Sequence, residues 1–142
     1  MIVVFFSSLS RLTEIEASHS RAHFLEKHGA QTSLESQLER VETAKNPTTG
    51  EIERHLSGPN IGLPRPPSAA THFLSHRDQL NAIHRAQLIF KRINLTASKE
   101  PMDMGKIIAE GYKKDGYEYG KTSKARVFLD EDGQPITAYG DF

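Results

Sequence analysis

The sequence predicts an α+β fold in which N-terminal helices pack on a small C-terminal antiparallel β-sheet. Apolar residues recur at three- and four-residue intervals through much of residues 18–94, which is typical of amphipathic helices. From Gly111 onward this period is lost and strand-forming residues follow, separated by turn residues. Because helical segments come first and strand segments last, the two kinds of element segregate along the chain, which favours an α+β architecture.

The length and composition indicate one domain over residues 1–142, an ordinary length for a single domain. The apolar content of 37% becomes roughly 44% when the 10 glycines are included, close to the usual value of about 45–50% and sufficient for a core. The opening run Met1–Phe6 is too short for a secretory signal and has no basic residue before it. We interpret it as a short buried strand, or residues 1–17 as the edge of a longer parent protein.

The absence of cysteine excludes disulfides, thiolate nucleophiles and cysteine-ligated zinc. No apolar stretch approaches the roughly 20 residues that a membrane helix needs, so no stable membrane association is expected. The net charge is zero, but residues 52–99 hold seven basic residues and two acidic ones. Such a segment can present a positive surface to a polyanion, although an ordinary solvated face has the same composition.

Two helices are expected in the N-terminal third of the chain. Residues 18–28 carry apolar residues at helical spacing, and Gly29 follows where helices commonly end. Thr32 is expected to cap a second helix, with Glu35 three residues later completing a capping box. The apolar stripe of this second helix is expected to consist of Leu34, Leu38 and Val41.

A turn and a loop separate these helices from the longest one. Asn46–Gly50 has turn composition, and residues 57–68 form a loop because they include four prolines and two glycines. Residues 71–94 are expected to form one long helix, free of glycine and proline. Its main body begins at Ser75 as N-cap, with Asp78 at the third position of a capping box.

The C-terminal third is expected to be mostly strand. After a short, weaker helical segment at Met102–Ile108, strands are predicted around residues 117–119 and over Ala125–Leu129. Asp130–Gly133 has the composition of a hairpin turn, and Gln134–Tyr139 is expected to return as the partner strand.

Seven histidines are the first candidates for chemistry. His19 with His23, and His72 with His76, stand four residues apart, which places two side chains on one helix face as a metal site requires. No His-Glu-x-x-His motif and no acidic cluster accompanies them, so a His-ligated metal-dependent nuclease remains an alternative only. The P-loop, G-x-G-x-x-G and G-x-S-x-G motifs are absent as well.

The remaining polar residues suit metal-free cleavage of RNA. In that reaction the 2′-hydroxyl of the substrate is the nucleophile, so the protein supplies only a base, an acid and cations for the phosphate. Histidine is the natural acid or base near neutral pH, and lysine, arginine and hydroxyl groups position phosphates. The chain offers histidines in the N-terminal helices, and polar residues at 121–124 and 137–139 in the predicted sheet.

Three segments resemble the C-terminal nuclease domains of bacterial polymorphic toxins in the Barnase–EndoU–colicin–RelE superfamily. The first is His23–Gly29, followed by a Leu/Arg-containing helix that ends near Arg40. The second is Thr71–Ser75 with its Gln79 continuation, and the third is the last hairpin with Ile136–Tyr139. The resemblance spans roughly residues 18 to 142. It implies an α+β ribonuclease domain that needs no metal or cofactor and leaves a 2′,3′-cyclic phosphate.

The resemblance also implies roles for individual residues. His23 and His28 become the acid and base, in either order, and Thr122, Thr137 and Tyr139 become further catalytic groups. Lys121 and Ser123 become substrate-binding residues. From their residue types and positions, Lys124 and Arg85 on the expected long helix are further candidates for substrate binding, with a salt bridge as the open alternative for Arg85. Other roles stay open: His28 can complement the dipole of a helix C-terminus, Tyr139 can pack in the sheet, and Thr122 and Ser123 can be turn residues.

The partners that follow from the resemblance are RNA, with tRNA favoured, and a cognate immunity protein that protects the producing cell. A host translation factor is a further partner that it allows. The domain is expected to be released from a larger secreted or cell-surface effector and to act in the cytoplasm of a target cell. The alternative from another class is an immunity or adaptor protein without catalysis, which would bind a partner and cleave nothing.

Overall fold

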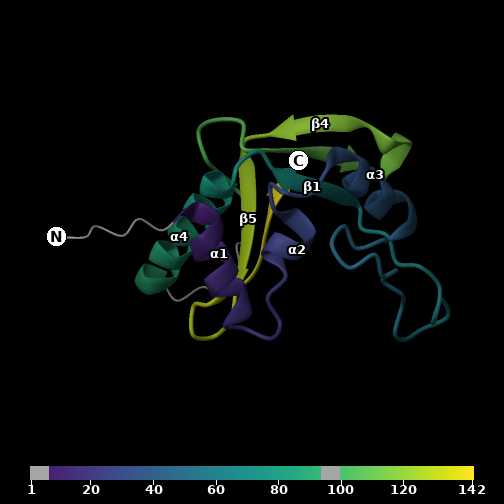
Figure 1. Cartoon of the computed structure of the whole chain (residues 1–142), viewed down its shortest axis with the longest axis horizontal. Helices are drawn as coiled ribbons and strands as arrows, with labels where there is room; N and C mark the ends of the chain where they lie inside the picture. The colour runs from purple at the N-terminus through teal and green to yellow at the C-terminus, as the bar shows by residue number, and fades with distance from the viewer. Residues whose placement is uncertain (1–6, 94–99) are drawn as a thin grey trace.

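Two small antiparallel sheets form the centre of the molecule (Figure 1), in a computed structural model that describes residues 7–93 and 100–142. The first sheet has the strand order β1-β3-β4 and consists of Ala69–Phe73, Ala109–Lys113 and Tyr119–Thr122. The second has the order β2-β5-β6 and consists of Met102–Asp103, Lys124–Leu129 and Pro135–Asp141. The α+β class is confirmed, and the sheet is divided in two, with β1 contributed from the middle of the chain.

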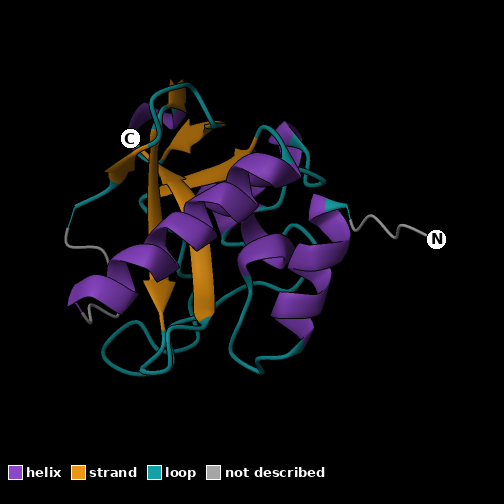
Figure 2. Ribbon diagram, turned by 90° about the vertical axis from the view of Figure 1, so that its left-hand side faces the viewer, coloured by secondary structure: helices purple, strands orange, loops and turns teal. Residues whose placement is uncertain are grey.

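Four helices cover these sheets: α1 (Ser8–Ala17), α2 (Phe24–His28), α3 (Leu34–Thr43) and α4 (His76–Ile93). Helix α4 packs on β5 and β6 with α1 beside it, as Figure 2 shows. Helix α2 lies against β6 and β1, and α3 against β1 and β3. A 3-10 turn at Asp115–Tyr117 joins β3 to β4. None of the described helices is long and apolar enough to cross a membrane.

The N-terminal helices differ from the expected ones. Ser7 caps α1 by accepting a hydrogen bond from the amide of Ser10, and Leu12 is fully buried. Helix α1 ends at Ala17, before the expected helix over residues 18–28 begins, and within that range only α2 is helical. The first half of the expected helix is wrong. The reason is a tertiary contact: the His23 amide donates to the carbonyl of Ile136 in β6 at 2.9 Å. The run Met1–Phe6 lies outside the described residues.

The cap of α3 is Ser33 rather than the predicted Thr32, because the Ser33 hydroxyl accepts from the Ser36 amide at 3.1 Å. Thr32 is buried and bonds sideways instead, donating to the carbonyl of Gly29 and accepting from the side chain of Gln37. The predicted apolar stripe is only partly right. Val41 is buried, but Gln37 and Arg40 are buried in place of Leu34 and Leu38.

The expected helix over residues 71–94 is a strand followed by a helix. Residues 69–73 pair with β3 along their full length, Thr71 opposite Gly111, and α4 begins at His76. The predicted cap is confirmed, because the Asp78 amide donates to the Ser75 hydroxyl at 3.1 Å. The helical segment expected at Met102–Ile108 is wrong: its first two residues pair with β5 as strand β2. Asn94 lies outside the described residues.

The second hairpin agrees with the prediction. Strands β5 and β6 pair from Lys124 opposite Asp141 to Leu129 opposite Pro135, and the turn closes with the Gly133 amide on the Asp130 carbonyl. Strand β6 extends two residues beyond Tyr139. Gln79, which is fully buried in α4, fixes this strand by donating to the carbonyls of Phe24 and Ala138.

The two sheets meet at Gly140, at the end of β6. The Thr71 hydroxyl donates to the Gly140 carbonyl at 2.9 Å, and the Thr122 hydroxyl donates to the next carbonyl, that of Asp141. A Cβ on residue 140 would lie 2.3 Å from the Cβ of Ala109. Both backbones are held by strand hydrogen bonds, so this contact admits glycine alone.

We expect Gly140→Ala to lower the free energy of unfolding by about 1–3 kcal/mol, because an added methyl group overpacks the junction of the sheets. Gly120→Ala is the matched control. It is also a strand glycine, but its added Cβ meets the ring of Phe142, which can rotate away. Urea unfolding of both variants tests this. Equal losses of stability in the two variants would contradict it.

Candidate active-site cleft

One cleft brings together four of the residues that the sequence singled out: His23, His28, Thr137 and Tyr139. It has a volume of about 480 Å³ and is lined by residues of α2, α3, β6 and β1, with the segment just before β1. We call it the α2–β6 cleft. Its other lining residues are Arg40, Pro67, Ser68, Ala69, Thr71, Arg126, Gly140 and Asp141.

His28 is the most enclosed of these groups, with 5% of its surface exposed. Its Nδ1 lies 3.1 Å from the carbonyl oxygen of Thr71. Because a carbonyl only accepts, Nδ1 carries the proton and Nε2 keeps its lone pair when the ring is neutral. Burial, with the nearby Arg40 charge adding to it, holds the pKa of His28 well below 6.5. The ring is therefore a neutral base at physiological pH.

His23 is built in the same way at the other end of α2. Its Nδ1 donates to the carbonyl of Arg21 at 3.1 Å, which again leaves Nε2 for a ligand. The side chain is half-buried. Burial, followed by the positive charge of Lys27, lowers the pKa of His23 below 6.5. The two histidines of the cleft thus each offer one free ring nitrogen.

Strand β6 supplies the hydroxyl groups. Thr137 and Tyr139 are two residues apart and therefore point to the same face, as the strand period requires. The Tyr139 ring packs between His28, at 5.3 Å between ring centres, and Phe128, at 6.3 Å. Burial raises the pKa of Tyr139, so its hydroxyl stays protonated. The Thr137 hydroxyl oxygen is buried without a hydrogen-bond partner among the described residues.

Two arginines of the cleft were missed by the sequence analysis. Arg126 lies opposite Tyr139 on β5 and forms an ion pair with Asp141 at 2.9 Å. Arg40 is 7% exposed on α3, and its Nη1 is buried without a partner within residues 7–93 and 100–142. A signal for Arg40 was present in the sequence: Gln37 stands three residues before Arg40 and four before Val41, so all three share one helix face. The apolar pattern predicted instead that Leu34 and Leu38 form the buried face.

The other predicted site residues lie outside the α2–β6 cleft. The Thr122 hydroxyl is committed to the backbone at the sheet junction, so its place is structural. Lys121, on β4, is exposed and opposite Glu110, and Lys124 is exposed at the start of β5. Ser123 joins β4 to β5, and its carbonyl accepts from the Met104 amide. Arg85 is on the outer side of α4 and donates to the carbonyl of Asp103 at 2.9 Å.

The histidine pairs do not share helix faces as the metal hypothesis supposed. His72 belongs to strand β1, and its Nε2 lies 2.9 Å from a carboxylate oxygen of Glu110. His19 follows α1 in a turn and bonds Asp130 at 2.9 Å. Within the part of the chain that the structure describes, no group of three or more metal-ligating side chains comes together.

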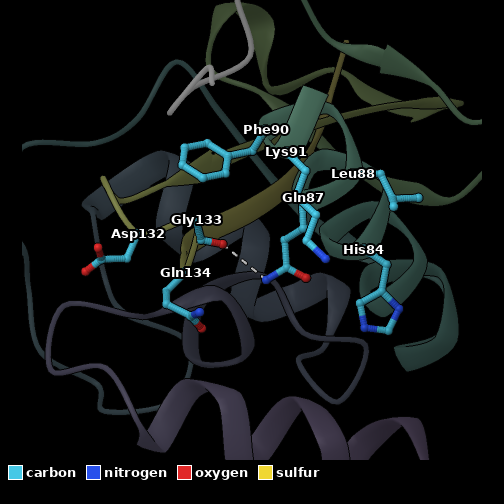
Figure 3. Close-up of a pocket in the computed structure, with 8 residues that line it drawn as sticks. All are labelled: His84, Gln87, Leu88, Phe90, Lys91, Asp132, Gly133 and Gln134. Atoms are coloured by element: carbon cyan, nitrogen blue, oxygen red, sulfur yellow. Dashed lines mark hydrogen bonds between the residues drawn. The ribbon is translucent and has the colours of Figure 1, made fainter. Parts of the chain in front are cut away.

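A second pocket of similar volume lies between α4 and the β5–β6 turn (Figure 3). Its one acidic lining residue, Asp132, and its histidine, His84, stand at opposite ends of the pocket. The hydrogen bond drawn there joins Gln87 to the Gly133 carbonyl at 3.2 Å, which is a structural contact. The polar groups of this pocket do not converge, so the α2–β6 cleft is the better candidate active site.

No family model, no curated protein and no solved structure matches the chain.

We expect the free energy of unfolding to decrease as the pH falls below about 6.5. His28 is neutral in the folded state because burial lowers its pKa, while the unfolded chain takes up a proton near 6.5. The stabilisation from neutral His28 is complete above that pH. It is lost as the pH falls toward the pKa of His28 in the folded state, and the free energy of unfolding changes by no more than about 1.4 kcal/mol per pH unit for one proton.

Urea unfolding of the wild type and of His28→Asn between pH 5 and 8 measures this effect. The variant should show a smaller decrease, with the remainder carried partly by His23. His84→Asn, on the exposed side of α4, is the matched control and should behave like the wild type. An equal pH dependence in wild type and His28→Asn would contradict the assignment.

Proposed function

We propose that this chain is a toxin ribonuclease that cleaves RNA by attack of the substrate's own 2′-hydroxyl. The observation that carries the proposal is the convergence of His23, His28, Thr137 and Tyr139 in one cleft. These residues come from both ends of the chain, and they are the types that this reaction needs: two ring nitrogens and two hydroxyls. Their convergence supports the resemblance to polymorphic-toxin nucleases, from which the roles were inferred.

The geometry suggests a division of roles between the histidines. His28 is the deeper ring and its pKa is held well below its ordinary value, so its Nε2 is the base that takes the proton of the 2′-hydroxyl. The 2′-oxygen then forms a bond to phosphorus as the bond to the 5′-oxygen breaks. His23, which is less enclosed, acts as the acid in its imidazolium form, in which Nε2 also carries a proton, and gives that proton to the leaving oxygen. The negative charge of the bound phosphate opposes the effects that lower the pKa of His23 and favours this form. The products are a 2′,3′-cyclic phosphate and a free 5′-hydroxyl.

The hydroxyls of Thr137 and Tyr139 are placed to donate to the phosphate oxygens as negative charge develops on them. The Tyr139 hydroxyl stays protonated because burial raises its pKa, which suits a hydrogen-bond donor. Within the described residues this hydroxyl forms no hydrogen bond to the protein, so it is available to a substrate. A preformed donor of this kind stabilises the transition state without reorganisation.

The biological setting of the proposal rests on the same resemblance. We propose tRNA as the substrate, a cognate immunity protein as the partner of the domain, and a larger secreted or cell-surface effector as its source, acting in the cytoplasm of a target cell. A host translation factor is a further partner to test, by adding an extract of the target cell to the reaction.

The purified chain is expected to cleave total RNA in the presence of EDTA and to leave 2′,3′-cyclic phosphate ends, because every group in the proposed reaction is an organic side chain. Product ends are identified by mass spectrometry and by their resistance to ligation. His28→Asn, prepared identically, controls for contaminating ribonuclease. Cleavage abolished by EDTA, or products with 3′-hydroxyl and 5′-phosphate ends, would favour the metal-dependent alternative. No cleavage of any RNA, with cell extract added, would favour the immunity or adaptor alternative.

Tyr139→Phe is expected to slow cleavage by roughly 30- to 1,000-fold, which corresponds to losing a transition-state hydrogen bond of about 2–4 kcal/mol. The substitution keeps the ring that packs on His28 and Phe128, so the melting temperature should change little. Tyr112→Phe, in the first sheet and outside the cleft, is the matched control. If Tyr139→Phe cleaves at the wild-type rate, Tyr139 is a packing residue only.

A further inference from the structure

Arg40, which lines the α2–β6 cleft, is in an unusual electrostatic state. We call the part of the cleft that Arg40 lines its floor. Arg40 is nine-tenths buried, and its Nη1 is enclosed without an acceptor. It forms no ion pair within the described residues. Burial lowers the pKa of Arg40, which reflects the unfavourable removal of its charge from water. Buried charges are normally paired, but the described part of the protein supplies no partner for this guanidinium. Its partner would therefore be a ligand.

The carboxylate that acts on Arg40 and the one that lines its cleft are both engaged with other cations. Glu53, whose charge favours the ionised guanidinium, bonds Lys27 at 2.5 Å. Asp141, which lines the cleft, bonds Arg126 at 2.9 Å. Both histidines of the cleft use Nδ1 on backbone carbonyls. The floor of the cleft therefore offers hydrogen-bond donors and positive charge, and no uncommitted acidic group.

A second group that lines the same cleft as Arg40 is also without a partner among the described residues. The Thr137 hydroxyl oxygen is buried in the same cleft and makes no hydrogen bond among the described residues. A guanidinium nitrogen and a hydroxyl that both lack partners line one cleft, from α3 and β6, and suit a ligand with several acceptor oxygens. The cleft, at about 480 Å³, is larger than one phosphate group and leaves room for an attached sugar.

From this arrangement we infer that the floor of the cleft is a binding site for a single phosphate group, held by the Arg40 guanidinium and the Thr137 hydroxyl. The guanidinium fork and a hydroxyl match the oxygens of a tetrahedral phosphate. The inference deepens the proposed ribonuclease function, in which the bound group would be the phosphate beside His23 and His28. The site itself requires no RNA and is expected to take inorganic phosphate alone.

The same argument predicts an unusual effect on stability. Replacing an arginine that supports the fold destabilises the protein. Replacing an arginine that serves a ligand removes the unfavourable free energy of burying its charge, and so does not. Arg40→Met keeps most of the volume of the side chain and removes the charge. We therefore expect Arg40→Met to be as stable as the wild type, or more stable, in a buffer without phosphate.

The experiment is a titration of the full chain with inorganic phosphate, read by melting temperature and by calorimetry. Phosphate should raise Tm of the wild type in a concentration-dependent way, since it binds the folded state. Arg40→Met should weaken binding by at least about tenfold, and Arg40→Lys, which keeps the charge but not the fork, by less. Arg92→Met, on α4 and outside the cleft, should match the wild type. Sodium chloride at equal ionic strength and acetate are the comparison anions.

A phosphate effect no larger than that of chloride, or one that persists fully in Arg40→Met, would overturn the inference. A stronger response to acetate than to phosphate would also overturn it, since the site would then be a carboxylate site. If Arg40→Met fails to fold, its role is structural and the stability argument fails, while Arg40→Lys still measures the dependence of binding on the fork. Phosphate binding without RNA cleavage would retain this site and reject the ribonuclease. RNA cleavage with unaltered phosphate binding in Arg40→Met would do the reverse.

Discussion

The position of strand β6 determines the rest of this structure. Side-chain and backbone donors from four other elements or loops converge on its carbonyl oxygens: the Gln79 amide on Ala138, the His23 amide on Ile136, and the two threonine hydroxyls on Gly140 and Asp141. These bonds are largely buried, so a donor left without its acceptor would lower the free energy of unfolding. They fix the register of β6 against α2, α4 and the first sheet. They also decide which face of the strand turns toward the histidines.

The electrostatics of the cleft follow from that placement. Each cation near the cleft histidines is either paired with a carboxylate, as Lys27 is with Glu53, or buried without a partner among the described residues, as Arg40 is. Both histidines are driven toward their neutral forms by burial and by these positive neighbours. An anionic ligand would oppose both effects at once, since it would offset the charge of Arg40 and favour protonation of His23. The free cleft is thus electrostatically incomplete in a way that negative charge relieves.

Local sequence signals predicted the features of the fold that depend on neighbouring residues. They failed where contacts between residues far apart in the sequence determine the structure. The fold class, the Ser75 cap and the last hairpin follow from short-range chemistry. The sequence predicts helix from residue 71, inside strand β1, because Phe73 leads directly into the periodicity of α4. Only the pairing of β1 with β3 distinguishes the strand. Thr32 has the composition of a cap, but burial redirects its hydroxyl. Of the predicted site residues, those on α2 and β6 converge. Arg40 was missed because a charged residue on a helix is normally interpreted as solvent-facing.

The two walls of the cleft come from opposite ends of the described chain, and this has a consequence for biosynthesis. The residues of α2 and α3 leave the ribosome long before Thr137 and Tyr139 exist, and the first sheet cannot receive the end of β6 until Gly140 has been made. Pairing between segments so far apart in sequence forms late in folding. A nascent chain would therefore hold its histidines without the opposite wall. The cleft would form in a single late step, when the last strand docks.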